Sequence, residues 1–475
     1  MGLTNSFGKH NGYLNFIGDI DDIYIDPDSI SGGIGTYEHP YNSFTGFTLT
    51  NNKVYRLKKN SSLTGVTALY LNSLTGVTLS TYGNGERPKF ICTQSLSQGY
   101  AIRLNNCLNC IISNWDITSS QIVMGMVRID NGKNNSIINC NIHDCLSDGT
   151  TNGSGIGIRA GGYNLKILNN EISYVGMDGM YIAGTTNLEI GHCYLHHINM
   201  NYIIDTGQTY SSGDGIQLDG EWVNYYIHHC IIDRSYINSG NKFNIIISSL
   251  NGTNVNSSGI TEYCTFKMSP NVVGGIYISN GNGNIIRYNK FEGYTWGVRI
   301  SGAVDGSGTI QNNTIQNTLI HNNLFYDSTY GVVISNQTTG GTAVTDTRNT
   351  KIYNNVFYKC GTHILIQNGY VDSRNNIHLR NGDSGKAMDN IVAGSSCDQY
   401  NNCYNDINLI SNRGSGITSM VSDPLCVNMN NYDFRLQTNS PCINSGINVN
   451  INYDYDMTII PQGSEPDIGA FEKYI

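Results

Sequence analysis

The feature that most constrains this chain is a short pattern that recurs along its middle: Ile, any residue, Asn/His/Tyr, Asn or Cys, any residue, Ile or Phe. Its closing apolar residues are Ile117, Ile142, Ile172, Leu195, Ile232, Phe266, Phe291, Phe325 and Phe357. The residues two places before them are Trp115, Cys140, Asn170, Cys193, Cys230, Cys264, Asn289, Asn323 and Asn355. Asn tolerates the left-handed backbone of a tight turn and can hydrogen-bond to an Asn above or below it, and Cys is a small substitute that can be buried. Such a column at a bend predicts a β-solenoid.

A second pattern, Gly, apolar, any residue, apolar, follows the first on nearly every repeat. It starts at Gly155, Gly179, Gly215, Gly275, Gly297 and Gly331, and Asn244 and His363 hold the same place. Alternation of this kind indicates a short strand with every second residue facing inward. Successive copies lie between 22 residues apart (Gly275 to Gly297) and 36 apart (Gly179 to Gly215), so one coil has twenty-odd residues plus a variable loop. A β-sandwich would not explain two columns that advance together, so the sequence predicts an all-β, parallel β-helix with an Asn/Cys ladder.

The repeat is absent from both ends of the chain, which predicts three regions. Residues 1–65 are expected to form an N-terminal cap and the first strands, residues 66–422 the β-helix, and residues 423–475 a C-terminal capping segment. Capped ends are expected because an open solenoid must block strand pairing at its edges.

Charge and hydropathy exclude two classes of partner. The net charge is −9 and only 13% of residues are charged, which argues against nucleic acid as a partner. No apolar run approaches the roughly 18 residues that a membrane span needs, so no membrane insertion is expected. The residues from Met1 to Asp19 do not resemble a signal peptide. Either a signal was removed, or the protein leaves a cytoplasm by another route, such as release of a virus particle. An extracellular or virion location is therefore expected.

The 13 cysteines are odd in number and lack the paired CxxC spacing of a zinc site. Several of them occupy the turn column described above. Most are therefore predicted to be buried, reduced packing residues.

Both ends of the chain resemble one group of proteins. The runs that begin at Asp423 (DP), Asp433 (DFRL), Ser440 (SPCINSG) and Pro466 (PDIGAFE) resemble the closing segment of right-handed β-helix repeat proteins of the pectate-lyase-like superfamily. The opening YIDP, GT and HPY motifs, which begin at Tyr24, Gly35 and His39, are similar to the start of the same group. This resemblance implies a right-handed parallel β-helix. Members include polysaccharide lyases, glycoside hydrolases, epimerases and phage tailspikes, so a polysaccharide is the expected partner.

The second pattern places candidate site residues on one face of the helix. Its outward positions are Gly157, Tyr181, Gln217, Ile246, Tyr277, Arg299, Val333 and Leu365. Just outside the strand ends lie Asp178 and Asp214 on one side and Arg159 and Asp219 on the other, followed by Glu221 and Trp222. Flat aromatic rings suit stacking on sugar rings. The predicted substrate-binding residues are therefore Arg159, Tyr181, Gln217, Glu221, Trp222, Tyr277 and Trp296.

Two reactions remain open. Glycoside hydrolysis needs two carboxylates, for which Asp178, Asp214 and Asp219 are candidates. The alternative for Asp178 and Asp214 is an ordinary turn, because each directly precedes a Gly.

Elimination instead needs a cation to neutralise a uronate carboxylate and a base to remove the adjacent proton. Lys242 and Arg299 are the candidate cations. The Arg299 region is similar to the arginine-bearing coil of alginate- and chondroitin-type β-helix lyases. Those enzymes carry a Ser-Asn-Lys sequence one coil earlier, and this chain has Ser279-Asn280-Gly281 there.

No cofactor and no metal site are predicted. His192 and His229 occupy the turn column, where a packing role is expected. A Ca²⁺ ion could use Asp214, Asp219 and Glu221, but no calcium-loop motif supports it.

Two classes of function follow from these patterns. The chain is either a polysaccharide depolymerase, including the tailspike kind, or a non-catalytic virion fibre or receptor-binding spike that recognises a surface glycan. The spike predicts a homotrimer, scattered acidic residues and no convergent groove.

Overall fold

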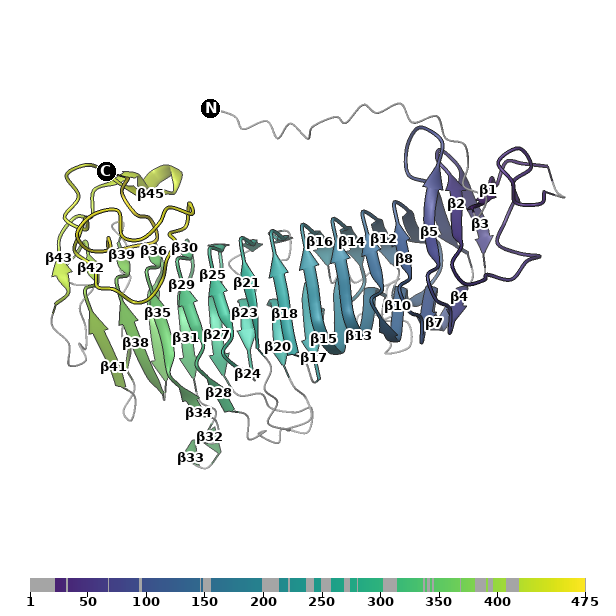
Figure 1. Ribbon diagram of the computed structural model, residues 1–475. Coiled ribbons are helices and arrows are strands. Elements are labelled where there is room, and N and C mark those ends of the chain that lie inside the picture. Colours follow the sequence, from purple (N-terminus) through teal and green to yellow (C-terminus); the bar gives the residue numbers. More distant parts are fainter. Residues whose placement is uncertain are drawn as a thin grey trace.

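The structure is a computed structural model. It describes residues 22–30, 33–66, 68–93, 96–145, 147, 155–198, 213–220, 223–235, 243–248, 258–268, 274–279, 281–301, 314–335, 338–339, 342–343, 346–367, 369–380, 390–391, 396–406 and 418–474. The chain winds into an elongated right-handed parallel β-helix, which confirms the predicted fold class (Figure 1).

Each coil passes in turn through three parallel sheets, here named sheets I, II and III. Sheet I contains β4 (Leu69–Asn72), β7 (Leu96–Asn105), β10 (Val123–Lys133), β13 (Ile156–Leu168), β15 (Met180–Gly191), β17 (Ile216–Asp219), β20 (Phe243–Ser248), β23 (Gly274–Ile278), β27 (Trp296–Ser301), β31 (Tyr330–Ser335), β37 (Thr362–Gln367) and β40 (Asn390–Ile391). Sheet II contains β1 (Asp22–Ile25), β2 (Val54–Lys58), β5 (Thr78–Tyr82), β8 (Ile111–Ser113), β11 (Ser136–Ile138), the second halves of β13 and β15, β18 (Val223–His228), β21 (Gly259–Glu262), β25 (Ile285–Arg287), β29 (Leu319–His321), β35 (Thr350–Tyr353), β38 (Tyr370–Arg374) and β41 (Ser396–Tyr400).

Sheet III contains β3 (Ser62–Val66), β6 (Lys89–Cys92), β9 (Asp116–Ser119), β12 (Asn141–Cys145), β14 (Glu171–Val175), β16 (Tyr194–Ile198), β19 (Ile231–Arg234), β22 (Thr265–Met268), β26 (Lys290–Glu292), β30 (Leu324–Tyr326), β36 (Val356–Tyr358), β39 (Ile377–Leu379), β42 (Cys403–Tyr404) and β43 (Met420–Val421). Short strands at the corner between sheets I and II are β24 (Gly281–Asn282), β28 (Thr314–Gln316) and β34 (Asp346–Arg348), and β32 (Thr338–Thr339) pairs with β33 (Thr342–Ala343).

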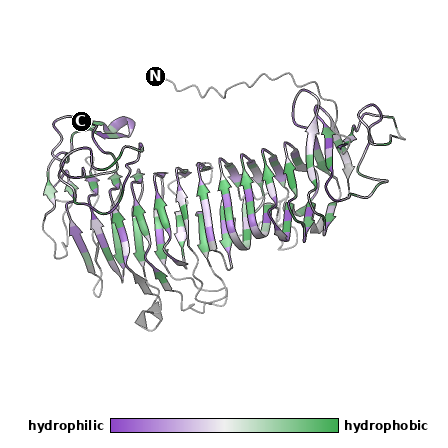
Figure 2. Ribbon diagram, in the orientation of Figure 1, coloured by the Kyte–Doolittle hydropathy of each residue, from purple (hydrophilic) through white to green (hydrophobic). Residues whose placement is uncertain are grey.

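The first sequence pattern gives the register of sheet III. The nine closing residues pair with one another from rung to rung, from Ile117 opposite Ile142 through to Phe325 opposite Phe357, and all nine are buried. The phenylalanines stack with ring centroids 4.7–4.9 Å apart. Buried and more exposed residues alternate along strands such as β2, β6 and β9, and the buried ones form the core. Hydrophobic and hydrophilic residues are interspersed along the strands (Figure 2).

The corner between sheets II and III differs in one detail from the prediction. The buried column forms a ladder in which Asn289, Asn323, Asn355, Asn376 and Asn402 bond to one another, with Nδ2–Oδ1 distances of 3.0–3.1 Å. The left-handed residues are those just before this column, such as Asn139 and Asn322. The buried amide of the column therefore supplies the ladder hydrogen bonds, and the residue before it makes the left-handed turn.

A second asparagine ladder runs along the corner between sheets I and II. Asn109, Asn134, Asn164, Asn187 and Asn224 are all left-handed, and each bonds to the next through Nδ2 and Oδ1 at 2.8–3.2 Å. The sequence pattern described above does not include this column. In the sequence, each Asn of this second ladder lies five residues before a left-handed turn residue of the corner between sheets II and III.

All 13 cysteines are buried and none forms a disulfide. Their burial agrees with the prediction of packing residues. Burial raises the pKa of Cys140 to about 11 and that of Cys360 to about 12, so these thiols stay protonated near neutral pH.

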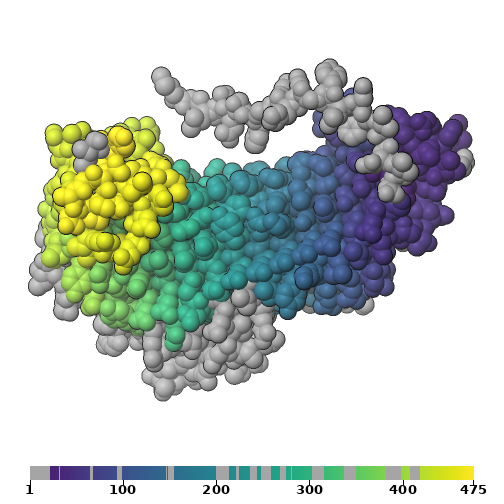
Figure 3. Space-filling model, in the orientation of Figure 1, coloured from purple at the N-terminus to yellow at the C-terminus, as the bar shows by residue number. Residues whose placement is uncertain are grey.

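The two end regions are built differently. At the N-terminal end, β1 and β2 lie within residues 1–65 and already join sheet II, and β3 of sheet III runs across the expected boundary to Val66. After residue 422 the chain forms an antiparallel pair, β44 (Cys426–Asn428) and β45 (Asp433–Leu436), linked by a 3₁₀ turn at Met429–Asn431. This C-terminal segment folds back along the side of the last coils, where Phe434 and Ile468 pack on Tyr358 and Ile377 of sheet III (Figure 3).

Candidate functional site

The outward residues of sheet I form one continuous column. The strand register places Tyr70, Arg103, Arg128, Arg159, Tyr181, Gln217, Ile246, Tyr277, Arg299, Val333 and Leu365 opposite one another on successive rungs. We call this set the outward column. Five of the residues predicted from sequence to bind substrate or act in catalysis belong to it: Arg159, Tyr181, Gln217, Tyr277 and Arg299.

The register corrects the sequence interpretation on one rung. Gly157 was expected to be outward, with Arg159 just outside the strand end. Instead, Arg159 lies opposite Tyr181 and belongs to the column itself. Both Gly155 and Gly157 begin a Gly-apolar-any-apolar match, so the pattern was ambiguous by two residues. The structure has the match that begins at Gly157, whose N–H donates a hydrogen bond of 3.0 Å to the backbone oxygen of Asp178.

Arg159, Tyr181 and Asp219 come together at the centre of the column. The Tyr181 hydroxyl donates a hydrogen bond of 2.6 Å to Asp219 Oδ2, and the Arg159 guanidinium lies 5.1 Å from the centre of the Tyr181 ring. Burial, followed by the hydrogen bond to Asp219, raises the pKa of Tyr181 far above its usual value. Tyr181 is therefore a protonated phenol near neutral pH. No carboxylate among the described residues pairs with Arg159.

Two further arginines extend this cluster, and the sequence analysis did not single them out. Arg103 and Arg128 share Asp130, with N–O distances of 2.9 Å and 2.7 Å. Tyr100 lies beneath Arg128, whose guanidinium is 5.2 Å from its ring centre, and its buried hydroxyl makes no hydrogen bond within the described chain. Arg103 and Arg128 precede Gly155, where the identified series of Gly-apolar-any-apolar matches begins, so the sequence pattern did not mark them as outward residues.

A surface hollow of about 440 Å³ adjoins the arginines at the corner between sheets I and II. Arg128, Arg159 and Tyr163 stand around it, while Gly161 and Gly162 lie along it. A Cβ atom at Gly161 would come within 2.5 Å of the Ala183 carbonyl oxygen, so the backbone here stays bare. The hollow is therefore lined by two guanidinium groups and by glycine backbone that carries no side chains.

A second group gathers around Arg299, further along the same column. Its guanidinium lies 4.5 Å from the Trp296 ring centre and 5.7 Å from that of Tyr277. Phe243 stacks on Tyr277 with ring centroids 4.8 Å apart. Arg299 also has no carboxylate partner among the residues that the structure describes, and its Nε makes no hydrogen bond there.

Asp178 and Asp214 lie on neighbouring rungs where sheet I begins. Asp178 Oδ1 accepts a 2.7 Å hydrogen bond from the backbone N–H of Asp214, and Asp214 Oδ1 accepts one of 2.8 Å from the N–H of Phe243. Both side chains are buried. Each aspartate thus accepts a hydrogen bond from the backbone of the following rung, as a side chain that stabilises a turn does.

Three predicted residues, Lys242, Glu221 and Trp222, lie outside the described residues. The calcium hypothesis therefore stays a prediction, since Glu221 was one of its three ligands. Among the described residues, one group of side chains is close enough to share a metal ion, namely His192, His228 and His229.

Comparisons with known proteins bear on the fold. No protein-family model and no curated protein sequence matches the chain. Similar solved structures include the alginate lyase AlyF-OU02 in complex with G6, at 12% identity over 90% of this chain and 91% of that chain, with a TM-score of 0.52. Tailspike protein 3 of bacteriophage CBA120 is 10% identical over 77% of this chain and 55% of its own, also with a TM-score of 0.52.

The pectate lyase Pel9A is 16% identical, over 95% of this chain and 96% of that chain, with a TM-score of 0.42. The alginate lyase and the tailspike, each with a TM-score of 0.52, confirm the resemblance to pectate-lyase-like β-helix proteins at the level of the fold. Within the part of the chain that the structure describes, no helix is long and apolar enough to cross a membrane.

Proposed function

We propose that this protein binds an acidic polysaccharide along the outward column of sheet I and cleaves it by elimination beside Arg159. The observation that carries the proposal is an arginine without a carboxylate partner among the described residues, placed next to the hydrogen-bonded Tyr181–Asp219 pair.

Binding follows from the arrangement of charge and aromatic rings. Arg159 and Arg299 are five rungs apart, which at about 4.8 Å per rung is roughly 24 Å along the helix axis. That length suits an extended chain with repeated carboxylates rather than a single sugar. Between the arginines lie Tyr181, Gln217 and Tyr277, which offer rings and an amide to sugar faces and hydroxyls.

The chemistry of elimination can be assigned to the three central residues. Arg159 neutralises the uronate carboxylate, which makes the proton on the adjacent carbon more acidic. Asp219 removes that proton, the bond from the ring to the glycosidic oxygen breaks, and Tyr181 protonates the departing oxygen. The proton on Asp219 then returns to the Tyr181 oxygen along their 2.6 Å hydrogen bond, so the site regains its starting state.

Hydrolysis by Asp178 and Asp214 is less well supported. A hydrolase needs one carboxylic acid and one free carboxylate facing the scissile bond. Here both carboxylates are buried and accept backbone N–H groups from the following rung. These two aspartates remain predictions for catalysis, and elimination is the reaction we favour.

Mass spectrometry of products tests the reaction. The full chain is incubated with alginate, polygalacturonate and a neutral glucan as a control. Alginate comes first because a protein of this fold is an alginate lyase. We expect fragments one water lighter than hydrolysis products from an acidic polymer and none from the glucan. Fully hydrated fragments would contradict elimination, and binding without any fragments would favour the glycan-recognising spike.

Two variants and one control test the residues. Arg159→Ala should weaken binding by about 10- to 100-fold, since a hydrogen bond to a charged group contributes roughly 1.5–3 kcal/mol. Tyr181→Phe should keep binding and slow cleavage at least about 100-fold. Arg374→Ala is the control, because Arg374 also lies over tyrosine rings but belongs to sheet II and pairs with Asp372. Equal losses in Arg374→Ala would refute the assignment to sheet I.

The proposed activity also implies a location for the protein. A polymer-cleaving β-helix of this kind would meet its substrate outside the cell or on a virion. The homotrimer expected of a tailspike can be checked by sedimentation of the full chain.

A further inference from the structure

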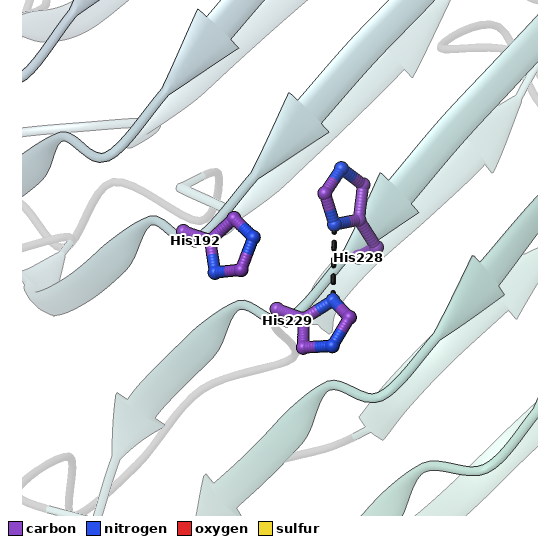
Figure 4. A group of neighbouring side chains, drawn as sticks. All are labelled: His192, His228 and His229. Atoms are coloured by element: carbon purple, nitrogen blue, oxygen red, sulfur yellow. Dashed lines mark hydrogen bonds between the residues drawn. The ribbon is translucent and has the colours of Figure 1, made fainter. Parts of the chain in front are cut away.

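Three histidines gather at the corner between sheets II and III, away from the outward column (Figure 4). His228 ends β18, and His229 follows it in the left-handed turn. His192 occupies the equivalent left-handed position one rung earlier. Asn139, Asn169 and Asn322 hold this turn position on other rungs, so histidine is not needed for the backbone conformation.

The geometry brings ligand atoms from two rungs together. His228 Nδ1 and His229 Nδ1 are 3.0 Å apart, and their rings are nearly perpendicular, at 85°. The His192 ring lies 5.2 Å from that of His228 and 4.7 Å from that of His229, measured between centroids. One nitrogen from each of the three lies within 4.8 Å of the others.

We propose that His192, His228 and His229 bind a divalent transition-metal ion, Zn²⁺ in the first instance, and thereby link two neighbouring coils. Imidazole nitrogen is a preferred ligand of Zn²⁺, Ni²⁺ and Cu²⁺. In a tetrahedral site with Zn–N distances of 2.0–2.1 Å, ligand nitrogens lie about 3.4 Å apart. The His228–His229 pair already approaches that separation.

The other nitrogen of His228 faces a carboxylate, although no hydrogen bond joins the two groups in this structure. Its Nε2 lies 3.5 Å from Glu189 Oε1, and the same carboxylate is held by Lys166 at 2.8 Å. A carboxylate behind a ligating imidazole fixes the ring and strengthens it as a ligand. Tyr226 stacks on the His228 ring at 4.3 Å and limits its rotation.

The surroundings of His228 and His229 also favour the neutral imidazole that a metal ion binds. Burial and then the neighbouring His192 lower the pKa of His229, and burial is likewise the main cause that lowers the pKa of His228, against the opposing effect of Glu189. Neutral imidazoles keep a lone pair near neutral pH. Glu262 and Lys166 are the other charged side chains nearby, and each is paired, with Arg287 and Glu189 respectively.

One side chain must move for the third bond to form. His192 is stacked nearly parallel to His229, at 18°, and a metal ion has to lie in the plane of each ring it joins. His192 is exposed, so it can turn out of this stack by side-chain rotation alone. Two ligands are thus placed in advance and the third closes over the ion, leaving a fourth position for water.

A second histidine pair in the chain provides a matched control. In Tyr194-Leu195-His196-His197, as in Tyr226-Ile227-His228-His229, the two Nδ1 atoms meet, here at 2.8 Å, and the first histidine contacts a glutamate, Glu171, at 3.1 Å. Tyr174, rather than a third histidine, stacks on His197. Both pairs therefore include a left-handed second histidine and a nearby glutamate, but the second pair lies in β16 of sheet III and lacks a third histidine.

Metal titration of the full chain tests the proposal. Zn²⁺ binding is measured by calorimetry against a chromophoric chelator, and Co²⁺ absorption reports tetrahedral coordination. We expect one Zn²⁺ per chain, at least tenfold weaker binding in His192→Asn and loss of the site in His229→Asn. His197→Asn should bind as the unaltered chain does. Asn is used because it forms the same left-handed turn elsewhere.

The double variant His192→Asn/His229→Asn retains every cysteine, so it also reports binding to thiols. Zn²⁺ should raise the melting temperature of the unaltered chain and leave that of the double variant unchanged. Equal Zn²⁺ uptake by the double variant, or an equal loss in His197→Asn, would overturn the three-histidine site. Loss of activity on polysaccharide would not, because the site is separate from sheet I.

Discussion

At the scale of single residues, Asp178 separates a structural role from a catalytic one. Its Oδ1 accepts the N–H of Asp214 from the next rung, so Asp178→Ala should lower the free energy of unfolding by about 1.5–3 kcal/mol. Asp178→Asn keeps an oxygen acceptor and should lose much less, with cleavage retained. Chemical denaturation and product assays on both variants check this. Loss of cleavage in Asp178→Asn at unchanged stability would make Asp178 catalytic instead.

The residues that the sequence placed correctly are those whose position depends only on strand register. Tyr181, Gln217, Tyr277 and Arg299 follow from alternation along sheet I, and the buried closing residues follow from the repeat. The pairing of Tyr181 with Asp219 depends on side-chain rotamers, which no spacing encodes. The proximity of the three histidines was not predicted, because they come from two rungs and two of them, His192 and His229, also suit the left-handed turn.

At the scale of strands, the glycines that begin sheet I set how closely the rungs approach. A Cβ atom at Gly157, Gly179, Gly215, Gly275, Gly297 or Gly331 would come within 2.4–2.7 Å of a carbonyl oxygen on the next rung. That oxygen belongs to a strand held by its own ladder of hydrogen bonds, so it cannot retreat cheaply. The Gly-led pattern is therefore a packing rule of the helix rather than a mark of the site.

Gly297→Ala tests this rule. The added methyl would meet the Gly331 oxygen at 2.6 Å and the Phe325 ring at 2.6 Å, and overpacking of this kind costs about 1–3 kcal/mol. Gly361→Ala is the matched control, since its nearest contact is 2.9 Å and the next is 3.7 Å. Thermal melts should show a larger drop for Gly297→Ala. Equal drops would mean that glycine is favoured there for another reason.

At the scale of the whole molecule, the C-terminal segment ties the last coils together from outside. Asn375 and Asn322, which are left-handed turn residues of the helix, donate side-chain hydrogen bonds to Ile447 O and Ala470 O. The segment is closed on itself by buried carboxylates. Glu472 accepts the backbone N–H groups of Gln462 and Asp467, at 2.8 Å and 3.1 Å. The packing within residues 423–474 thus involves a few buried acidic side chains.

The charge on Glu472 should make this packing sensitive to pH. Burial raises its pKa from 4.5 to about 7, and burial also raises the pKa of Asp454 and Asp467 beside it. A pKa raised on folding contributes stability that is complete below the unfolded value and is lost as the pH rises through the folded one. Stability from Glu472 is therefore expected to fall between pH 4.5 and about 7.

The buried histidines change the stability in the opposite direction as the pH rises. The effect of Glu472 is therefore measured by comparing the unaltered chain with a variant at each pH. Burial lowers the pKa of His321 to about 4 and that of His363 to about 3, which removes stability as the pH falls below their usual values. Glu472→Gln stays neutral at every pH and leaves these histidines unchanged. Melting temperatures across pH 4.5 to 8 should show the unaltered chain losing stability relative to Glu472→Gln as the pH rises to about 7. A constant difference would mean that Glu472 does not change its charge in this range.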